Sequence, residues 1–434
     1  MKSLSRDVSE FLNSLGMFGW KLGLERMNAM AGALNHPERK YTTIHIAGSN
    51  GKGTVAHILE NIYLRAGYRV ALYTSPHLVS PLERLRIQGR PIDATDFETG
   101  LRNMMPLLRQ HQATYFEAMT LLAFERFTRA GVDIAIVETG LGGRLDATNI
   151  LQPACSIITT IALEHQNYLG STLELIAGEK AGIIKETVPC ILGDMPETAQ
   201  RVILNRCRTQ QSEATLATEH IRVEVLHLSA DGMTVRLHLP AAKESPATIH
   251  TPLLGRHHVS NIASAVAAVV QLQPHHPVPM RAILQGLQHV RIPGRMQRLS
   301  ASPPVLADVA HNEQSIRAVL QTVSAIWPQR RLRIVMGLLR DKDVANILQA
   351  VAAYPAHLIC VTPSSERALQ AEELRQQAEH AGLPAVSEPS IIAAVETARK
   401  RARNEDVILI TGSHYVVGEV LSKWPDIANC SADA

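Results

Sequence analysis

The sequence predicts an α/β protein of two domains: a P-loop-containing N-terminal domain with a mostly parallel sheet, and a smaller, Rossmann-like C-terminal domain. Three observations lead to this prediction. The 434 residues exceed the size of one ordinary domain. Near-continuous apolar runs alternate with segments of helical periodicity, which is typical of parallel strands covered by helices on both faces. The pair Pro293-Gly294 interrupts any regular element late in the chain. We therefore expect domains at residues 1–297 and 298–434.

The first predicted strand is TTIHIAG, residues 42–48. A helix should follow it and end near Gly67, because the apolar residues after the strand recur at helical spacing. Four more strands are expected in this domain, at YRVALYTSP, VDIAIVETGLGG, ACSIITTIALEH and VPCILGD. Each is short, apolar and bounded by turn residues, as expected for strands buried in a sheet.

The sequence pattern changes at about residues 220–250. There, IRVEVLHL and MTVRLHLP alternate apolar and polar residues on either side of the turn signal SADG. This pattern predicts an antiparallel hairpin. The segment GRHHVSNIASAVAAVVQL then predicts a helix. Beyond the proline-glycine break, VLADVAHN, RLRIVMGLL, HLICVTP and DVILITGS predict the strands of the second domain.

The composition argues against some classes of binding partner and indicates a cellular compartment. A net charge of +3 gives no reason to expect nucleic acid as a partner. No run approaches 18 apolar residues, so no membrane span is expected. The cysteines are dispersed without a C-x-x-C pair, which argues against a disulfide framework and a structural zinc site. With no signal-peptide pattern at the N-terminus, a cytoplasmic location is expected.

The stretch GSNGKGT, residues 48–54, lies between the first strand and its helix. It departs from the usual phosphate-binding loop, because Gly53 separates Lys52 from Thr54. Its position still favours phosphate binding, since backbone N–H groups at a helix start bind anions. A plain glycine-rich turn is the alternative.

Polar residues follow several of the predicted strands. Ser75, Glu138 and His165 each stand at or near the carboxyl end of one of these segments. The carboxyl ends of parallel strands meet at one edge of a sheet, where ligands bind. Hydroxyl and carboxylate oxygens suit Mg²⁺, whereas an imidazole is a less usual ligand for it. These residues predict a nucleotide site with a divalent metal, although a capping carboxylate and a hydrogen-bonded histidine are the alternatives. Lys180, beside Glu179, would by default be half of an exposed ion pair.

Several motifs occur in one order along the chain: GSNGKGT, YTSPHL, ERLRIQG, VETGLGGRLDATN, EKAGI, PGR, DVAHN, GLLRDKD and ITGSHYVVGEV. From about residue 21 to residue 420 the chain resembles the folylpolyglutamate synthase/dihydrofolate synthase branch of the Mur ligase family. The resemblance implies an ATP-dependent amide ligase. ATP would phosphorylate a carboxylate of a reduced folate or of dihydropteroate, and the amine of L-glutamate would attack the acyl phosphate. A monomer is also implied.

The resemblance also implies roles for single residues. The ATP site would comprise Ser49, Asn50, Gly51, Lys52, Gly53, Thr54, Asn261, Arg295 and Asp308. Magnesium, at two sites, would be held by Ser75, Glu138 and His165. Lys52, Lys180 and His311 would be catalytic, with Lys180 carbamylated into an anionic oxygen donor. The pterin would lie near Leu22, Gly23, Thr114, Tyr115, Phe116, Glu117, Leu145, Asp146 and Ala147.

The chain departs from the family pattern at several positions, one of which is Gln166-Asn167 in place of a Thr-Asp type pair. Glu164 replaces an aspartate before the metal histidine, and Glu313 replaces a proline after AHN. Lys21 stands where some bifunctional members carry an acidic residue, which weakens the case for dihydropteroate as a substrate. Two other readings stay open: a Mur-type ligase acting on a non-folate carboxylate, and a nucleotide-binding regulatory module without chemistry.

Overall fold

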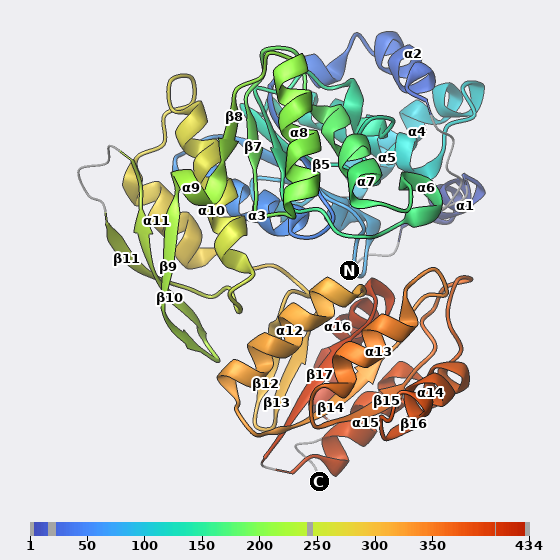
Figure 1. Ribbon diagram of the computed structural model, residues 1–434. Helices are drawn as coiled ribbons and strands as arrows, with labels where there is room; N and C mark the ends of the chain where they lie inside the picture. Colours follow the sequence, from blue (N-terminus) through green and yellow to red (C-terminus); the bar gives the residue numbers. More distant parts are fainter. Residues whose placement is uncertain (1–3, 16–22, 241–245, 404, 430–434) are drawn as a thin grey trace.

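The computed structural model describes residues 4–15, 23–240, 246–403 and 405–429. It confirms the predicted fold class. A large α/β domain lies above a smaller one in Figure 1, and a small antiparallel sheet extends from the side of the large domain.

The large domain is built on an eight-stranded sheet in the order β4-β3-β2-β5-β1-β6-β7-β8. Its strands are β1 Thr42–Ala47, β2 Val70–Tyr73, β3 Leu85–Ile87, β4 Arg90–Pro91, β5 Ile134–Glu138, β6 Cys155–Ile158, β7 Cys190–Leu192 and β8 Ala214–Leu216. Six neighbouring strands of the sheet, β2, β5, β1, β6, β7 and β8, pair in parallel. Strands β3 and β4 form an antiparallel edge that the sequence analysis did not predict.

Helices cover both faces of this sheet because alternate strand residues point to opposite sides. On β2, Val70 and Leu72 pack into one core and Ala71 and Tyr73 into another. The first face carries α3 Lys52–Arg65, α10 His258–Leu272 and α11 Met280–His289. The second carries α1 Arg6–Ser14, α2 Glu25–Ala33, α4 Ala94–Gln110 and α5 Tyr115–Ala130.

A separate core lies beyond β6, beneath α7 Leu173–Lys180 and α8 Glu197–Thr209. The short helices α6 Gln166–Leu169 and α9 Ala217–His220, and 3₁₀ turns at Pro37–Arg39, Pro81–Arg84, Ala147–Ile150 and Ala181–Ile183, complete the connections. Strand β9 Arg222–Ser229 pairs antiparallel with β10 Gly232–His238, and a third strand, β11 Ala247–Thr251, pairs with β10.

The smaller domain has a six-stranded sheet in the order β12-β13-β17-β14-β15-β16. The strands are β12 Gln297–Ala301, β13 Pro304–Ala307, β14 Arg331–Met336, β15 Ala356–Cys360, β16 Ala385–Ser387 and β17 Asp406–Thr411. Only β12 runs antiparallel to its neighbour. The helices are α12 Glu313–Ile326, α13 Val344–Ala352, α14 Ala371–His380, α15 Ile391–Arg401 and α16 His414–Asn429.

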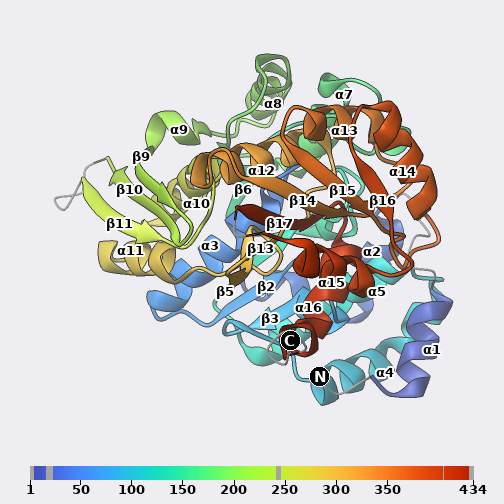
Figure 2. The same cartoon turned by 90° about the horizontal axis from the view of Figure 1, so that it is seen from below.

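The two domains face each other across the carboxyl ends of their parallel strands. Seen from below, the six-stranded sheet and its helices lie across the large domain (Figure 2). Loops that follow β1, β5 and β6 above, and β13, β14 and β17 below, therefore meet at one place. Within the described ranges, no helix combines the length and the apolar character needed to cross a bilayer.

Candidate active site

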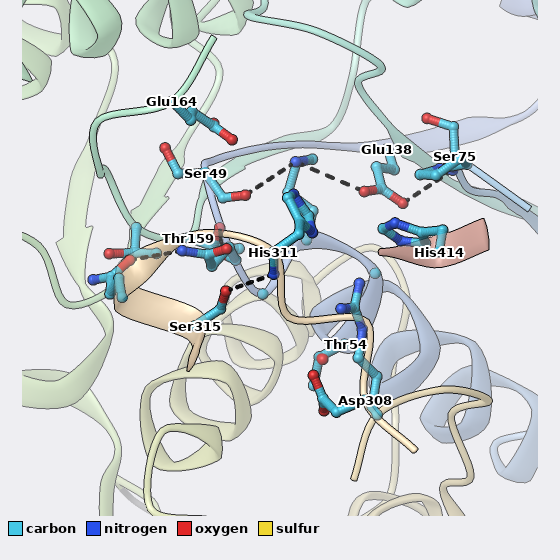
Figure 3. Close-up of a pocket in the computed structure, with 18 of the residues that line it drawn as sticks. Ser49, Thr54, Ser75, Glu138, Thr159, Glu164, Asp308, His311, Ser315 and His414 are labelled. Carbon is cyan, nitrogen blue, oxygen red and sulfur yellow. Dashed lines mark hydrogen bonds and ion pairs between the residues drawn. The ribbon is translucent and has the colours of Figure 1, made fainter. Parts of the chain in front are cut away.

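A cleft of about 650 Å³ lies where the two domains meet, and residues of both domains line it (Figure 3). Fifteen residues that the sequence analysis proposed for ligand binding line this one cleft: Ser49, Asn50, Gly51, Lys52, Gly53, Thr54, Ser75, Tyr115, Phe116, Glu138, His165, Asn261, Arg295, Asp308 and His311. The fold thus brings together segments that are far apart in the chain.

The loop from Gly48 to Gly51 turns tightly between β1 and α3. Gly51 has a φ of 87°, in the left-handed region that favours glycine. A Cβ atom at Gly51 would lie 2.3 Å from Oδ1 of Asn261, so a side chain there would displace that amide. Gly51 caps α3 without any side-chain hydrogen bond. The first N–H groups of the helix therefore have no side-chain acceptor from the cap residue, as a phosphate site requires.

Neighbouring segments hold this loop from the large domain. The N–H of Ser49 donates to the carbonyl of Thr160 at 2.7 Å, and its hydroxyl accepts from the N–H of Ala162 at 3.0 Å. The hydroxyl of Thr159 donates to the carbonyl of Asn50 at 2.7 Å. Since β6 ends just before Thr159, the loop is fixed to the same strand end that leads to His165.

Lys52 bends back over the loop. Its Nζ donates to the carbonyl of Gly48 at 2.9 Å and lies 3.9 Å from Oε1 of Glu138. The other carboxylate oxygen of Glu138 accepts from the N–H of Ser75 at 3.3 Å. Burial raises the pKa of Glu138, and the charge of Lys52 opposes that rise. Thr54, in the first turn of α3, is buried and lines the cleft (Figure 3).

The oxygen-rich group at this end fits a hard divalent cation. Ser75 and Glu138 supply a hydroxyl and a carboxylate, which are oxygen donors of the kind that Mg²⁺ takes. Burial lowers the pKa of His165 to about 4, so its imidazole is neutral at pH 7 and able to coordinate a metal. In the part of the chain that is described, no three histidine, cysteine, aspartate or glutamate side chains are grouped as a ready-made metal site.

Lys180 is buried, so the expectation from its local sequence that it forms an exposed ion pair with Glu179 is wrong. Only 2% of the residue is exposed. Its Nζ donates to the carbonyl of Gly48 at 3.0 Å and lies 2.8 Å from Oε1 of Glu164. Glu179 instead pairs with Arg144, at 2.8 Å. Lys180 points into the protein because it closes α7 at the point where the helix packs behind the loop.

Two of the departures from the family pattern, Glu164 and Glu313, now have a structural account. The longer side chain of Glu164 reaches Lys180, and the charges of Lys180 and Lys52 lower the pKa of Glu164 against the effect of its burial. Glu313 pairs with Arg317 one turn further along α12, at 2.8 Å, and does not line the cleft. Lys21 lies outside the described residues.

The smaller domain contributes a histidine that follows β13. The Nδ1 atom of His311 lies 2.8 Å from the carbonyl of Val309, and because a carbonyl only accepts, Nδ1 carries the proton. Burial lowers the pKa of His311 to about 3, so its other ring nitrogen is a free base. The ring lies 5.5 Å from that of His414. Asp308 accepts from the N–H groups of Met296 and Ala310, and burial raises its pKa.

Another part of the cleft wall is aromatic. Tyr115 and Phe116 line it at the start of α5. The guanidinium of Arg84 lies over the ring of Tyr115, 5.3 Å from its centre, and donates from Nε to Nδ1 of His77 at 2.9 Å. A Cβ atom at Gly140 would lie 2.5 Å from the ring of Phe116. The absence of a side chain at Gly140 therefore leaves the space that the ring of Phe116 occupies.

Several residues proposed for the pterin do not line the cleft: Gly23, Thr114, Glu117, Leu145, Asp146 and Ala147, while Leu22 lies outside the described residues. Thr114 and Glu117 form a capping box at the start of α5, and Glu117 also pairs with Arg26 at 2.9 Å. Asp146 accepts from the N–H groups of Gly140 and Leu141 with one oxygen. Its other oxygen accepts from the N–H and the hydroxyl of Thr148.

Sequence reasoning gave no role to some residues of the cleft, namely His77, Arg84, Lys342, Arg367, Ser413 and His414. Most lie in motifs that were quoted for the resemblance but given no role. A signal was present, because SPHL and GSHY follow predicted strands, as Glu138 does.

Comparisons with known proteins agree with this architecture. The model of the Mur ligase middle domain matches residues 46–269, and that of the Mur ligase glutamate ligase domain matches residues 294–414. A dihydrofolate synthase/folylpolyglutamate synthase of Bacillus subtilis is 31% identical over 96% of this chain and 98% of its own length. An Escherichia coli FolC structure in complex with DHPP and ADP superposes with a TM-score of 0.86 at 30% identity, covering 96% of this chain and 98% of that one.

A third relative is a bifunctional folylpolyglutamate synthase/dihydrofolate synthase with Mn, AMPPNP and L-glutamate bound. Its TM-score is 0.84 at 30% identity, over 96% of this chain and 98% of that one. Family models, full-length sequence similarity and fold all point the same way. The chain belongs to the folylpolyglutamate synthase/dihydrofolate synthase branch of the Mur ligase family.

Proposed function

We propose that this protein is an ATP-dependent ligase that joins L-glutamate to a reduced folate, and also to dihydropteroate. The observation that carries the proposal is the single cleft that holds both a phosphate-binding loop and an aromatic pocket. Lys52 and Glu138 line this cleft together with Arg84, Tyr115 and Phe116. ATP at the loop and an aromatic acceptor at the two rings would share one reaction space.

The reaction needs positioning and charge stabilisation more than covalent help from the protein. Phosphoryl transfer from ATP to the acceptor carboxylate gives ADP and an acyl phosphate. The glutamate amine then attacks the acyl carbon, a proton leaves the amine, and phosphate departs as the amide forms. Lys52 stabilises negative charge at the phosphates. The unprotonated ring nitrogen of His311 can accept a hydrogen bond from the attacking amine on the side of the smaller domain.

Ser75, Glu138 and His165 would hold Mg²⁺, at two sites together with ATP oxygens. The metal supplies Lewis-acid stabilisation of charge on phosphate and acyl oxygens. The solved relative that holds Mn and AMPPNP supports a divalent cation beside the nucleotide. Asn261, Arg295 and Asp308 would contact the nucleotide from the far side of the loop.

Lys180 is proposed to be carbamylated. Burial lowers the pKa of its amine, which favours the neutral form that reacts with carbon dioxide. The modification would replace an ammonium with an anion 2.8 Å from the present position of a Glu164 oxygen. Glu164 would then have to turn away or take up a proton. The intact mass of the active enzyme tests the proposal, because a carbamate adds the mass of one carbon dioxide.

L-Glutamate brings two carboxylates, and Arg84 is a buried cation in the aromatic part of the cleft wall. Its Nε is engaged by His77, and this contact orients the guanidinium in the cleft. We propose that Arg84 receives a carboxylate of glutamate or of the folate tail. The relative with bound L-glutamate supports a glutamate site within this fold.

One assay tests the function. Protein, MgATP and L-glutamate are mixed with tetrahydrofolate or with dihydropteroate, and release of ADP is followed. Acceptor-dependent release is expected with tetrahydrofolate, and the ratio of the two rates measures the effect of Lys21. Release with a UDP-sugar acceptor alone would favour another Mur-type ligase. ATP binding without turnover for every acceptor would favour a regulatory module. A monomer is also proposed, and light scattering at assay concentration tests it.

A further inference from the structure

A chain of three side-chain amides links the phosphate-binding loop to the smaller domain. The Nδ2 atom of Asn312 donates to Oδ1 of Asn50 at 3.1 Å. The Nδ2 atom of Asn50 in turn donates to Oε1 of Gln314 at 2.7 Å. Asn50 belongs to the loop of the large domain, whereas Asn312 and Gln314 lie at the start of α12 in the smaller one. Both polar atoms of the Asn50 side chain are thus bonded across the domain boundary.

The helix start determines how these amides are oriented. Asn312 is the N-cap of α12, and its Oδ1 accepts from the N–H of Ser315 at 2.9 Å. Its Nδ2 is therefore the atom left to face Asn50. That donor requires the oxygen of Asn50 to point towards it, which leaves Nδ2 of Asn50 for Gln314. One helix cap thus sets the direction of all three bonds.

Asn50 is also held from its own domain, through its backbone. Its carbonyl accepts from the hydroxyl of Thr159 at 2.7 Å, and the next residue, Gly51, is the left-handed residue before α3. On the other side, His311 directly precedes Asn312, and its N–H donates to the Ser315 hydroxyl within the same cap. The three amides therefore connect the turn that carries Lys52 with the turn that carries His311.

We propose that Asn312 and Gln314 are positioning residues that clamp the smaller domain onto Asn50 and so set the place of His311 relative to the phosphate-binding loop. The bonds of the clamp form without ATP, so the clamp holds the two domains together before nucleotide binds. Its kinetic consequence rests on the proposed function, but its structural consequence does not. Removing either amide should loosen the domain arrangement, and the loop and His311 should then meet less often in the reactive geometry.

The test uses three variants that lose the clamp, and the two in the smaller domain leave the phosphate-binding loop unchanged. Asn312→Ser keeps a good helix cap but is too short to reach Asn50. Gln314→Met keeps the length of the side chain without its polar atoms, and Asn50→Ser shortens the shared partner. Glu313→Gln is the matched control, because Glu313 lies between the two clamp residues and pairs with Arg317.

Two readouts are measured on the full-length protein. By small-angle scattering without nucleotide, each clamp variant should have a larger radius of gyration than the wild type and Glu313→Gln. In the ADP-release assay, each should lower kcat by about 2- to 10-fold, the range for one net hydrogen bond. The double variant Asn50→Ser/Gln314→Met should be no slower than Asn50→Ser alone, because one shared bond is lost only once.

Multiplying effects in the double variant would show that Gln314 acts by itself, for instance on ATP, and would overturn the clamp. So would scattering curves identical to those of the wild type for all three variants. Scattering remains decisive if no acceptor supports turnover, so a failure of the proposed function is told apart from a failure of the clamp. Circular dichroism confirms that each variant is folded.

Discussion

The part of the cleft proposed for phosphate (the phosphate end) presents its side chains to the cleft, whereas in the part proposed for the acceptor (the acceptor end) several side chains bond to neighbouring protein atoms instead. At the phosphate end, Lys52, Glu138 and His165 all line the cleft. At the acceptor end, Tyr115 and Phe116 line it, but Glu117 and Asp146 use their oxygens on neighbouring protein atoms. Some residues of a motif thus line the cleft, whereas others only fix the position of the residues that line it.

The difference has a physical origin. A triphosphate is bound by charge and by N–H groups, so its site exposes polar atoms. A flat aromatic ligand is bound by stacking and shape, which require rigid walls. Buried carboxylates that accept from backbone N–H groups, as Asp146 does, supply such rigidity.

The largest effect is expected at Lys180, which belongs to the phosphate end without lining the cleft. Lys180→Ala should abolish ADP release. Relative to wild-type protein with an unmodified lysine, it should also lower the free energy of unfolding by about 3–5 kcal/mol, because Glu164 is left buried and unpaired. Denaturant unfolding and the ADP assay measure the two effects. The double variant Lys180→Ala/Glu164→Gln should recover stability but not activity. Recovery of both would make Lys180 purely structural.

Lys52→Ala should lower kcat by about 10²- to 10³-fold, as expected for a charge that stabilises the transition state. The fold should persist, since the Lys52 amine bonds only to carbonyls of its own loop and lies 3.9 Å from Glu138. Turnover by ADP release and thermal melting are the measurements. A rate like that of the wild type would show that the loop is only a turn. The phosphate end and the acceptor end would then not differ in how their side chains are used.

A smaller effect is expected at the acceptor end. Asp146→Asn replaces one acceptor oxygen by a donor that faces N–H groups, so it should cost about 1–3 kcal/mol of stability. The KM for the folate acceptor should rise with that loss, while the KM for ATP stays unchanged. If the acceptor KM rises without any change in melting temperature, Asp146 is a direct ligand and the two ends are built alike.

The smallest effect concerns pH and His45, which lies behind the same wall. Its Nε2 is 2.8 Å from the Thr148 hydroxyl, which donates to Asp146, and burial lowers the pKa of His45 to about 3. Unfolded chains protonate histidine near pH 6.5, so the folded state loses stability as pH falls from about 6.5 towards 3. Above about pH 6.5 His45 is neutral in both the folded and the unfolded state, so it adds nothing to the pH dependence of the free energy of unfolding.

His45→Gln keeps a donor for Thr148 and removes the titration. Below pH 6.5 its free energy of unfolding should fall less steeply than that of the wild type, by up to about 1.4 kcal/mol per pH unit. Urea unfolding between pH 4 and pH 8 measures this. Parallel pH curves for the two proteins would show that His45 becomes protonated within the fold.

Much of the fold was predictable because its signals are local. The strands at β1, β5, β6 and β17 are apolar runs between turn residues, and Val55, Ile58 and Ile62 mark α3 by their spacing. The edge strands β3 and β4 were missed, because a two- or three-residue strand carries too little periodicity to read.

The sequence alone determined the positions of the glycine-rich loop and of the polar strand ends, because parallel strands of one sheet must present their carboxyl ends together. Only the tertiary structure decided where Lys180 and Glu313 point. A lysine at a helix end is exposed or buried according to what the helix packs against, and α7 packs behind Gly48. The pairing of Asn50 with Asn312 and Gln314 likewise joins residues some 260 positions apart, with separations of 262 and 264. No local pattern encodes such a contact, since it exists only once two domains meet.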